Sequence, residues 1–245
     1  MPCCSEHTDW QHRTRLLVGD SGIERLCTAS VAIIGLGGVG GYAVEAVARA
    51  GVGRLLLIDG DVVETTNLNR QVLALNTTLG QNKTDTARER IAAIHPGTTV
   101  ETLSVRIGEH SLSTLGIDAG WHVIDAIDDL DAKVALLRYL YQRGIPGVAS
   151  MGAGQRLDPT RVQVADISAT RGCPLARRVR QRLRQNGIAR GIPCVFSDEP
   201  PVRPCAVEEP NNNALIGSIS YLPALFGMMA AGVVINHILK GAVST

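Results

Sequence analysis

The sequence predicts an α/β fold of the Rossmann type, with a mostly parallel sheet that helices cover on both faces. Three observations support this: a short apolar run that enters a glycine-rich turn, a second apolar run that ends in an acid, and a continuing alternation of strand-like and helix-like segments. The chain has 245 residues and 45% of them are hydrophobic, which is enough for a core in one domain or in a domain with an appendage.

The first elements follow from their patterns in chain order. Residues 10–28 are typical of a helix, with Asp20 and Ser21 as a plausible cap before "GIERLC". Residues 31–34 read as a buried strand, residues 41–50 as a helix that Gly51 closes, and residues 55–58 as the second strand.

The middle of the chain continues the alternation. Residues 62–75 are polar and then apolar, which indicates a loop that enters a short helix, and residues 82–96 have apolar positions at helical spacing up to Pro96. Further strands are predicted within 98–107, 122–129 and 145–154, with a helix through Tyr141 after the second of them. This order predicts parallel strands with helical crossovers.

From about Thr170 the alternation stops, and an irregular C-terminal part is expected. The run Ala214 to Leu239 is long enough to cross a bilayer, but Pro223, Asn236 and His237 within it favour a buried strand plus helix. Membrane association stays a minority alternative. Because a run this apolar is poorly suited to water, it also predicts a homodimer interface.

The turn "GLGGVG" has the G-x-G-x-x-G spacing that lets backbone N–H groups approach a phosphate. Asp59 ends the second strand roughly 20 residues later, where an acid can hold ribose hydroxyls. These features alone are compatible with NAD as well as with ATP.

The segment "TNLNRQ" and the later Lys83 favour a nucleotide triphosphate. Arg70 and Lys83 supply positive charge for phosphates, and Asn67 and Gln71 supply amides that hold oxygens without added charge. Since Lys83 lies between polar residues, we expect its side chain to face solvent or ligand.

Asp128, in "VIDAIDD", is expected near the end of the fourth strand, where a carboxylate can hold Mg²⁺ beside phosphates. Asp125 and Asp129 are weaker candidates for this role. The six cysteines form no C-x-x-C pair, so zinc is not expected. The charged start of the chain does not resemble a signal peptide, which predicts a cytoplasmic protein with free thiols.

The net charge of +1 requires any nucleic-acid affinity to come from a local patch. One strongly cationic stretch follows residue 170 and is nearly free of acids. Such a run is usually a helix face that contacts only water. If the substrate is a nucleic acid, the same arginines are instead expected to contact its phosphates. The candidate contacts are Arg177, Arg178, Arg180, Arg182 and Arg184.

Taken together, "GLGGVG", "LIDGDVVETTNLNRQ", "GQNKTDTARERIAAIHP" and "VIDAIDD" resemble the ThiF/MoeB/HesA superfamily, the relatives of ubiquitin-activating enzymes. The resemblance implies a single ThiF-type domain over 1–245, with a nucleotide-binding half at about 12–165 and a substrate-binding and dimerisation half at about 166–245. It also implies that ATP adenylates a carboxylate.

The same resemblance assigns roles by position. Lys83, Arg70 and Asp128 become catalytic candidates, with Asp128 on the Mg²⁺ side, and Arg13 matches an arginine that reaches into a partner's site, with Arg15 as its competitor. The implied ATP contacts are Gly35, Gly37, Gly38, Gly40, Asp59, Asp61, Asn67, Arg70, Gln71, Lys83 and Asp128.

The stretches "DPTRVQVAD" and "CVFSDE" are similar to one branch of the superfamily, the tRNA threonylcarbamoyladenosine dehydratases. This implies an ATP-dependent ring closure, with net loss of water, on a modified adenosine of tRNA. The alternative is adenylation of the C-terminus of a ubiquitin-like sulfur-carrier protein. A non-catalytic nucleotide fold and an NAD oxidoreductase are disfavoured by Arg70, Lys83 and Asp128 together. A redox or sulfur role for Cys173 or Cys194 stays open.

Overall fold

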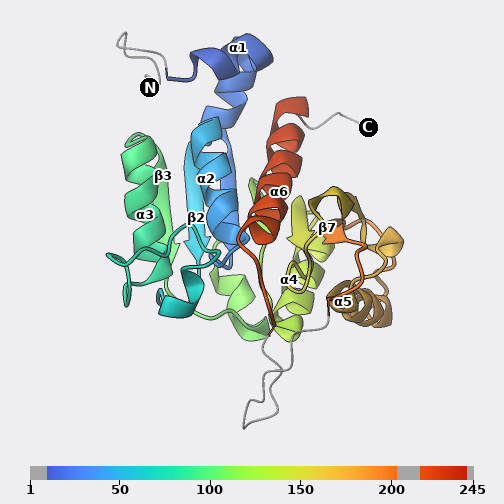
Figure 1. Cartoon of the computed structure of the whole chain (residues 1–245). Coiled ribbons are helices and arrows are strands. Elements are labelled where there is room, and N and C mark those ends of the chain that lie inside the picture. The colour runs from blue at the N-terminus through green and yellow to red at the C-terminus, as the bar shows by residue number, and fades with distance from the viewer. Residues whose placement is uncertain (1–9, 203–215, 242–245) are drawn as a thin grey trace.

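The computed structural model describes residues 10–202 and 216–241, and these form one sheet with helices on both of its faces (Figure 1). The sheet has seven strands in the order β3-β2-β1-β4-β5-β7-β6, and all neighbouring pairs are parallel except β6 with β7. The strands are β1 (Ser30–Ile34), β2 (Arg54–Ile58), β3 (Thr99–Leu103), β4 (Trp121–Asp125), β5 (Gly147–Ser150), β6 (Val162–Asp166) and β7 (Pro193–Ser197). The predicted fold class is confirmed.

The longer helices are α1 (His12–Thr28), α2 (Gly40–Ala50), α3 (Lys83–Ile94), α4 (Leu130–Arg143), α5 (Pro174–Gln185) and α6 (Tyr221–Lys240). Short 3₁₀ turns are η1 (Thr65–Asn67), η2 (Glu109–Thr114), η3 (Pro159–Arg161) and η4 (Ile167–Ala169).

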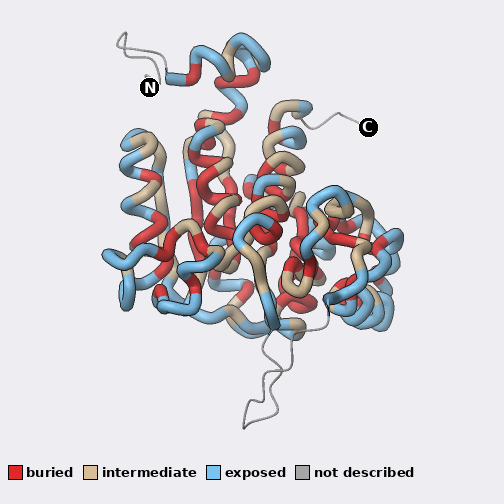
Figure 2. The backbone as a smooth tube through the Cα atoms, in the orientation of Figure 1, coloured by how far each residue is buried: buried red, intermediate tan, exposed pale blue. Residues whose placement is uncertain are grey.

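The core lies on both faces of the sheet because side chains alternate along each strand. Val31 and Ile33 pack with α2 and α6, whereas Ala32 and Ile34 join the cluster beneath η2 and α4. Figure 2 shows the buried residues concentrated along the strands and the inner sides of the helices. Both faces of the central strands are covered, which is why β1 and β2 read as continuous apolar runs, whereas the edge strands β3 and β6 mix apolar and polar residues.

α1 consists of two helical segments. Gly19 has a φ of +70° and a non-helical ψ, so the chain changes direction there, just before Asp20 and Ser21, where the sequence predicts a new start. Only the second segment contributes buried side chains, among them Leu26. The first segment projects at one end of the molecule (Figure 1).

α6 is a single helix that packs against α2. A β-carbon on Gly227 would lie 2.2 Å from the Val39 carbonyl oxygen, so the glycine permits this close approach. By length and composition α6 is apolar enough to span a membrane, but 44% of its most apolar window is buried inside the protein. The predicted strand before it was wrong, because residues 216–220 form none; residues 214 and 215 lie outside the described part.

The short helix predicted within residues 62–75 is a three-residue 3₁₀ helix, η1, in the polar first part of this segment and not an α-helix in its apolar second part. The chain forms η1 and then successive turns. The side chain of Asn67 accepts the backbone N–H of Glu64 at 3.1 Å, which offers the backbone an alternative to helical hydrogen bonds.

Candidate active site

The candidate site lies where the carboxyl ends of β1, β2 and β4 meet. β1 pairs with β2 on one side and with β4 on the other. The strand order therefore reverses at β1, with β2 and β3 on one side of it and β4 and β5 on the other. Ligands of open α/β sheets bind in the crevice at such a switch point. A β-carbon on Gly35 would lie 2.7 Å from the Ala126 carbonyl oxygen, so the loops after β1 and β4 touch.

The glycine turn divides into structural and ligand-facing positions. Gly35 has a φ of +87°, and a β-carbon on Gly40 would lie 1.7 Å from the Gly35 carbonyl oxygen, so both are needed to close the turn. At Gly37 the nearest atom to such a carbon is 3.8 Å away, and that atom belongs to Gln71. The turn leads into the N-terminus of α2, whose first N–H groups have no intrahelical acceptor.

The carboxylate of Asp59 braces the glycine turn. One oxygen accepts the Leu36 N–H at 2.6 Å, and the other accepts the Asp61 N–H at 2.8 Å. The acid at the end of β2 therefore has a structural role in the turn. Contact with ribose hydroxyls stays a prediction.

Lys83 is buried and does not face solvent, because its side chain is only 7% exposed; contact with a ligand, the other part of the expectation, stays a prediction. Its Nζ donates to Asp61 at 3.2 Å, and Arg106 donates to the other oxygen of Asp61 at 2.9 Å. Burial raises the pKa of Asp61, but the charge of Lys83 and the hydrogen bonds from Lys83 and Arg106 outweigh it and hold the pKa below its usual value. Asp61 is therefore paired with two cations, Lys83 and Arg106. Both are side-chain types that can also bind phosphates.

The amide and guanidinium groups of 67–71 lie beside the turn. Asn67 is buried, and Arg70 donates to the Thr66 carbonyl and to the Asn69 side chain, each at 2.9 Å. The Gln71 side chain is buried against Gly37, and its Oε1 has no hydrogen-bond partner in the described chain. An unpaired buried amide at this position matches a site that a polar ligand completes.

Asp128 is exposed three residues beyond the end of β4 and has no hydrogen bond or ion pair with any described residue. Asp129 instead caps α4 through the Ala132 N–H at 2.8 Å. Asp125 is fully buried and bonds Lys133 at 2.7 Å, where burial raises its pKa against the opposing charge of Lys133. Of these three acids, Asp128 is the one available to a ligand.

Lys133 was missed by the sequence reasoning. It is fully buried and also donates to the Ser150 carbonyl at 3.0 Å, so one side chain joins α4 to the ends of β4 and β5. A signal existed in the sequence, because Lys133 falls on the same helical stripe as Leu130, Leu137 and Leu140. A buried lysine with two acceptors holds the loop that carries Asp128.

Arg13 does not lie beside the glycine turn of its own chain. α1 leads directly into the first residue of β1, whereas the turn follows the last one, and α1 lies at the opposite end of the sheet from the turn (Figure 1). The length of β1, about 15 Å, separates the two ends. Arg15 forms an ion pair with Asp20, whereas Arg13 is exposed and has no described partner.

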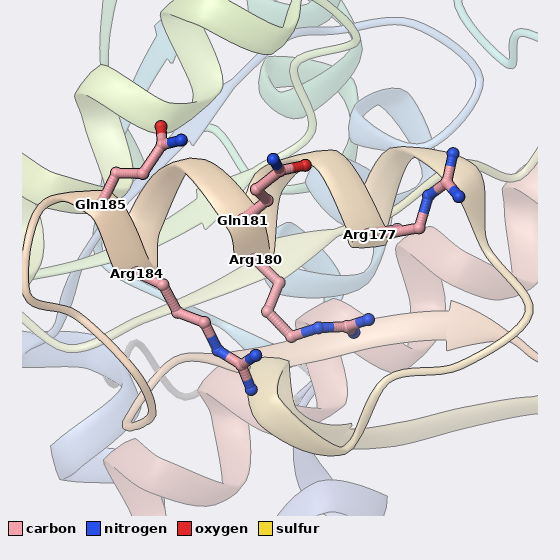
Figure 3. Close-up of a pocket in the computed structure, with 5 residues that line it drawn as sticks. All are labelled: Arg177, Arg180, Gln181, Arg184 and Gln185. Atoms are coloured by element: carbon pink, nitrogen blue, oxygen red, sulfur yellow. The ribbon is translucent and has the colours of Figure 1, made fainter.

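The five candidate tRNA contacts lie on α5, but they are not equally available. Arg180 donates to the carbonyl and hydroxyl oxygens of Thr170, at 2.7 and 2.6 Å, and Arg182 pairs with Asp131 at 2.9 Å. Three arginines are exposed and have no partner in the described chain: Arg177, Arg178 and Arg184. Arg177, Arg180 and Arg184 line an open hollow of about 450 Å³. Figure 3 shows their side chains along α5.

The two cysteines considered for sulfur chemistry are buried. Burial raises the pKa of the Cys194 thiol far above its usual value. The sulfur of Cys173 accepts the Ala176 N–H at 3.5 Å at the start of α5. The burial of Cys194 disfavours a thiolate nucleophile at that position.

Comparison with known proteins agrees with this geometry. The chain is 41% identical over 241 residues to the tRNA threonylcarbamoyladenosine dehydratase of Bacillus subtilis, covering 93% of this chain and 94% of that one. The crystal structure of the Escherichia coli enzyme in complex with ATP covers 97% of this chain and 98% of its own, with a TM-score of 0.84 and 32% identity. The molybdopterin-synthase adenylyltransferase of Salmonella typhimurium is 35% identical but covers only 56% of this chain and 54% of its own length.

The match at the level of the family extends over nearly all of the sequence. The family model described as ThiF matches residues 11–244, which include the glycine turn, the cationic segments and α6. The chain therefore belongs to the ThiF family.

Proposed function

We propose that this protein is an ATP-dependent tRNA threonylcarbamoyladenosine dehydratase. The observation that carries the proposal is the end-to-end likeness to dehydratases of that name, one of them solved with ATP, combined with phosphate-compatible groups at the switch point of the sheet. The likeness to molybdopterin-synthase adenylyltransferases covers 56% and 69% of the chain, against 93% for the dehydratase of Bacillus subtilis, which favours the tRNA substrate over the carrier-protein alternative.

The reaction is an acyl activation followed by ring closure. An oxygen of the threonyl carboxylate attacks the α-phosphorus of ATP, a C–O–P linkage forms, and pyrophosphate leaves. A nitrogen or oxygen within the same modification then attacks the acyl carbon and AMP leaves, so that the nucleoside loses one water overall. An intramolecular acceptor needs no enzyme nucleophile, which agrees with the buried thiols of Cys173 and Cys194.

The site residues supply position and charge. In this proposal the turn at Gly35, Gly37, Gly38 and Gly40 lets the α2 N-terminus approach the phosphates, and Asp59 holds the ribose. Lys83 and Arg70 stabilise the charge that develops at the phosphates. Asn67, Gln71 and Asp61 complete the proposed ATP contacts.

Mg²⁺ is compatible with the residues present. Mg²⁺ is commonly held by one or two carboxylates together with substrate phosphates and waters. Asp128 offers one exposed carboxylate without a described partner, on a loop that Lys133 holds in place. We propose Asp128 as its ligand, where the ion would neutralise phosphate charge.

The exposed arginines of α5 are the proposed contacts for tRNA phosphates. Arg177 and Arg184 are seven residues apart, which places them on one face about 10 Å apart along the helix. Arg180 and Arg182 have protein partners and are weaker candidates than the sequence alone indicates. A cytoplasmic location remains part of the proposal, because tRNA is the substrate and Cys173 and Cys194 are free thiols.

We keep the homodimer as a proposal but place its interface on α1 rather than on the apolar run 214–239, because the α6 helix of that run packs against α2. Leu16 and Leu17 lie on the projecting first segment of α1 and are 76% and 85% exposed. Two adjacent leucines on a projecting helix are typical of an association surface. In a dimer built on this segment, Arg13 would reach the partner's site and not its own.

Nucleoside mass spectrometry tests the proposed function. The protein is incubated with ATP, Mg²⁺ and tRNA that carries threonylcarbamoyladenosine, and the tRNA is then digested to nucleosides. We expect that nucleoside to lose the mass of one water only when ATP is present. An unchanged nucleoside, with AMP released in response to a Gly-Gly-tailed carrier protein instead, would replace the proposal by the alternative.

A further inference from the structure

Arg156 is a buried cation without sufficient partners. It is only 3% exposed, and its Nε and Nη1 atoms have no hydrogen-bond acceptor in the described chain. The one bond of its guanidinium runs from Nη2 to the Gly172 carbonyl oxygen at 3.3 Å. An unpaired buried charge is costly, so its retention points to a ligand that completes it.

The neighbouring acids do not neutralise Arg156. Glu199 accepts the backbone N–H groups of Leu157 and Asp158. Asp198 is paired with Arg161 at 2.9 Å and with Arg171 at 2.8 Å. The acidic groups of this loop cluster are therefore occupied by other donors.

The backbone around Arg156 is joined to the nucleotide end of the site. The Gln155 N–H donates to the Gly217 carbonyl at 2.8 Å, and the next carbonyl, that of Ser218, accepts the Asn69 side chain at 3.3 Å. Asn69 in turn bonds Arg70. A segment of two residues thus separates the Arg156 loop from the proposed phosphate-binding loop.

A second connection runs through the start of α6. The Tyr221 hydroxyl donates to the Leu157 carbonyl at 2.8 Å. Two residues further along, the Pro223 side chain packs 3.0 Å from where a β-carbon on Gly38 would lie. The residue after Arg156 is therefore linked through the start of α6 to the glycine turn.

The guanidinium of Arg156 lies beside the segment that leads into α5. Gly172, whose carbonyl it contacts, precedes the first residue of α5, Pro174, by two positions. Arg156 lies between the proposed ATP loops and the helix proposed to meet tRNA phosphates. In the proposed reaction, the group that must lie between these two places is the threonyl carboxylate, a small anion.

We propose that Arg156 binds the carboxylate of the modified adenosine, the group that is adenylated, and so selects modified over unmodified tRNA. The inference rests on the proposed function. A guanidinium holds a carboxylate through parallel N–H donors, which fixes its orientation toward the α-phosphorus. Arg156 is not needed for the phosphates of ATP, because Arg70 and Lys83 are the proposed contacts for them. It is also not placed to bind tRNA phosphates, because the exposed arginines of α5 are more accessible to them than a buried arginine.

The test compares Arg156→Met with Arg161→Met, five residues away in the same loop, where the arginine has Asp198 as its partner. The full-length protein is titrated, without ATP, with one tRNA in modified and unmodified forms. We expect Arg156→Met to weaken binding of the modified form at least about tenfold and to leave the unmodified form and ATP unaffected. Arg161→Met should keep the discrimination, and Arg156→Lys should restore part of it.

A substrate variant tests the same contact without mutating the protein. Conversion of the threonyl carboxylate to a carboxamide should weaken binding to the wild-type protein about as much as Arg156→Met does, and the two changes should not add. The melting temperature of Arg156→Met should be unchanged or higher, because an unpaired buried charge has been removed.

Retained discrimination by Arg156→Met, or equal binding of carboxylate and carboxamide by the wild-type protein, would overturn the inference. Equal losses for modified and unmodified tRNA would overturn it too, because the role would then be structural or directed to tRNA phosphates. If any of these results is found but the wild-type protein still converts modified tRNA, the inference fails and the proposed function stands. If the wild-type protein converts none, the proposed function itself fails.

Discussion

The ammonium nitrogen of Lys83 lies 3.2 Å from one carboxylate oxygen of Asp61, and Arg106 lies 2.9 Å from the other oxygen. The two cations differ in burial, since the Lys83 side chain is 7% exposed and that of Arg106 is 85% exposed. A lysine held in this way at the proposed phosphate site needs no large rearrangement to stabilise charge that develops during adenylation.

Lys83→Met should reduce turnover on the order of 100-fold, which corresponds to about 3 kcal/mol in the activation barrier. Arg106→Met, which removes the other partner of Asp61, should change turnover much less. ATP-dependent conversion of modified tRNA and the pyrophosphate released with it are the measurements. Near-normal adenylation by Lys83→Met would remove Lys83 from the catalytic residues.

Lys83→Met should also lower stability in a pH-dependent way. Because the pKa of Asp61 is held below its usual value, its stabilising contribution is present above its unfolded pKa and is lost as the pH falls through the folded pKa. The difference in melting temperature between wild type and Lys83→Met should therefore be larger at pH 7 than at pH 3. An equal difference at both values would show that the loss comes from packing alone.

Two glycine substitutions should separate folding from nucleotide binding. At Gly37 a β-carbon has its nearest neighbour at 3.8 Å, so Gly37→Ala should fold normally and weaken ATP binding by filling the phosphate approach. At Gly40 the same carbon would lie 1.7 Å from a carbonyl oxygen, so Gly40→Ala should lower the melting temperature as well. Melting curves and ATP titrations measure the two effects, and normal ATP binding by Gly37→Ala would contradict the proposed approach.

The exposed arginines of α5 should determine the salt dependence of tRNA binding. Replacing Arg177 and Arg184 with Gln should weaken tRNA binding and flatten the slope of log affinity against log salt by somewhat under one unit per contact. Arg182→Gln serves as the control because Arg182 already pairs with Asp131. An unchanged affinity and slope in the double variant would make this face an ordinary solvated surface.

Replacement of Leu16 and Leu17 with Glu should convert the proposed dimer into a monomer without unfolding it, because neither side chain is part of the core. Light scattering at micromolar concentration gives the mass, and a wild-type monomer there would exclude the dimer. In a dimer, mixing Arg13→Ala with Lys83→Met, each of which has strongly reduced activity, should restore part of the activity after subunit exchange. No recovery despite exchange would place Arg13 outside the partner's site.

His122 should make the protein less stable in mild acid. Burial and the neighbouring His237, 3.0 Å away, lower the pKa of His122. The unfolded chain, with a His pKa of about 6.5, then binds the proton first, so stability falls as the pH drops from about 6.5 through the folded pKa. His122→Gln should reduce this loss between pH 7.5 and 5.5, and the exposed His110→Gln should not; equal pH profiles in all three proteins would contradict it.

Local patterns in the sequence determined the parallel sheet, the glycine turn and the choice of a nucleotide triphosphate. Those features depend on short segments: apolar runs mark strands buried on both faces, and Gly35 and Gly40 are required by contacts within a single turn. Asp59, Arg70 and Asp128 follow strands or turns whose ends are readable in the sequence. Their convergence follows from the parallel order of the strands, because the carboxyl ends of parallel strands meet at one edge.

Only the tertiary structure decided which charges are paired. From the sequence alone, Lys83 is predicted to be a polar surface residue, but in the structure it pairs with Asp61, 22 positions away. Arg182 is predicted to be unpaired, but in the structure it pairs with Asp131 of α4. Arg156 gives no local signal at all, since its burial and its missing acceptors depend on strands, loops and α6 that come together from distant parts of the chain. Burial and pairing are long-range properties, and helical or strand periodicity records only which face a residue occupies.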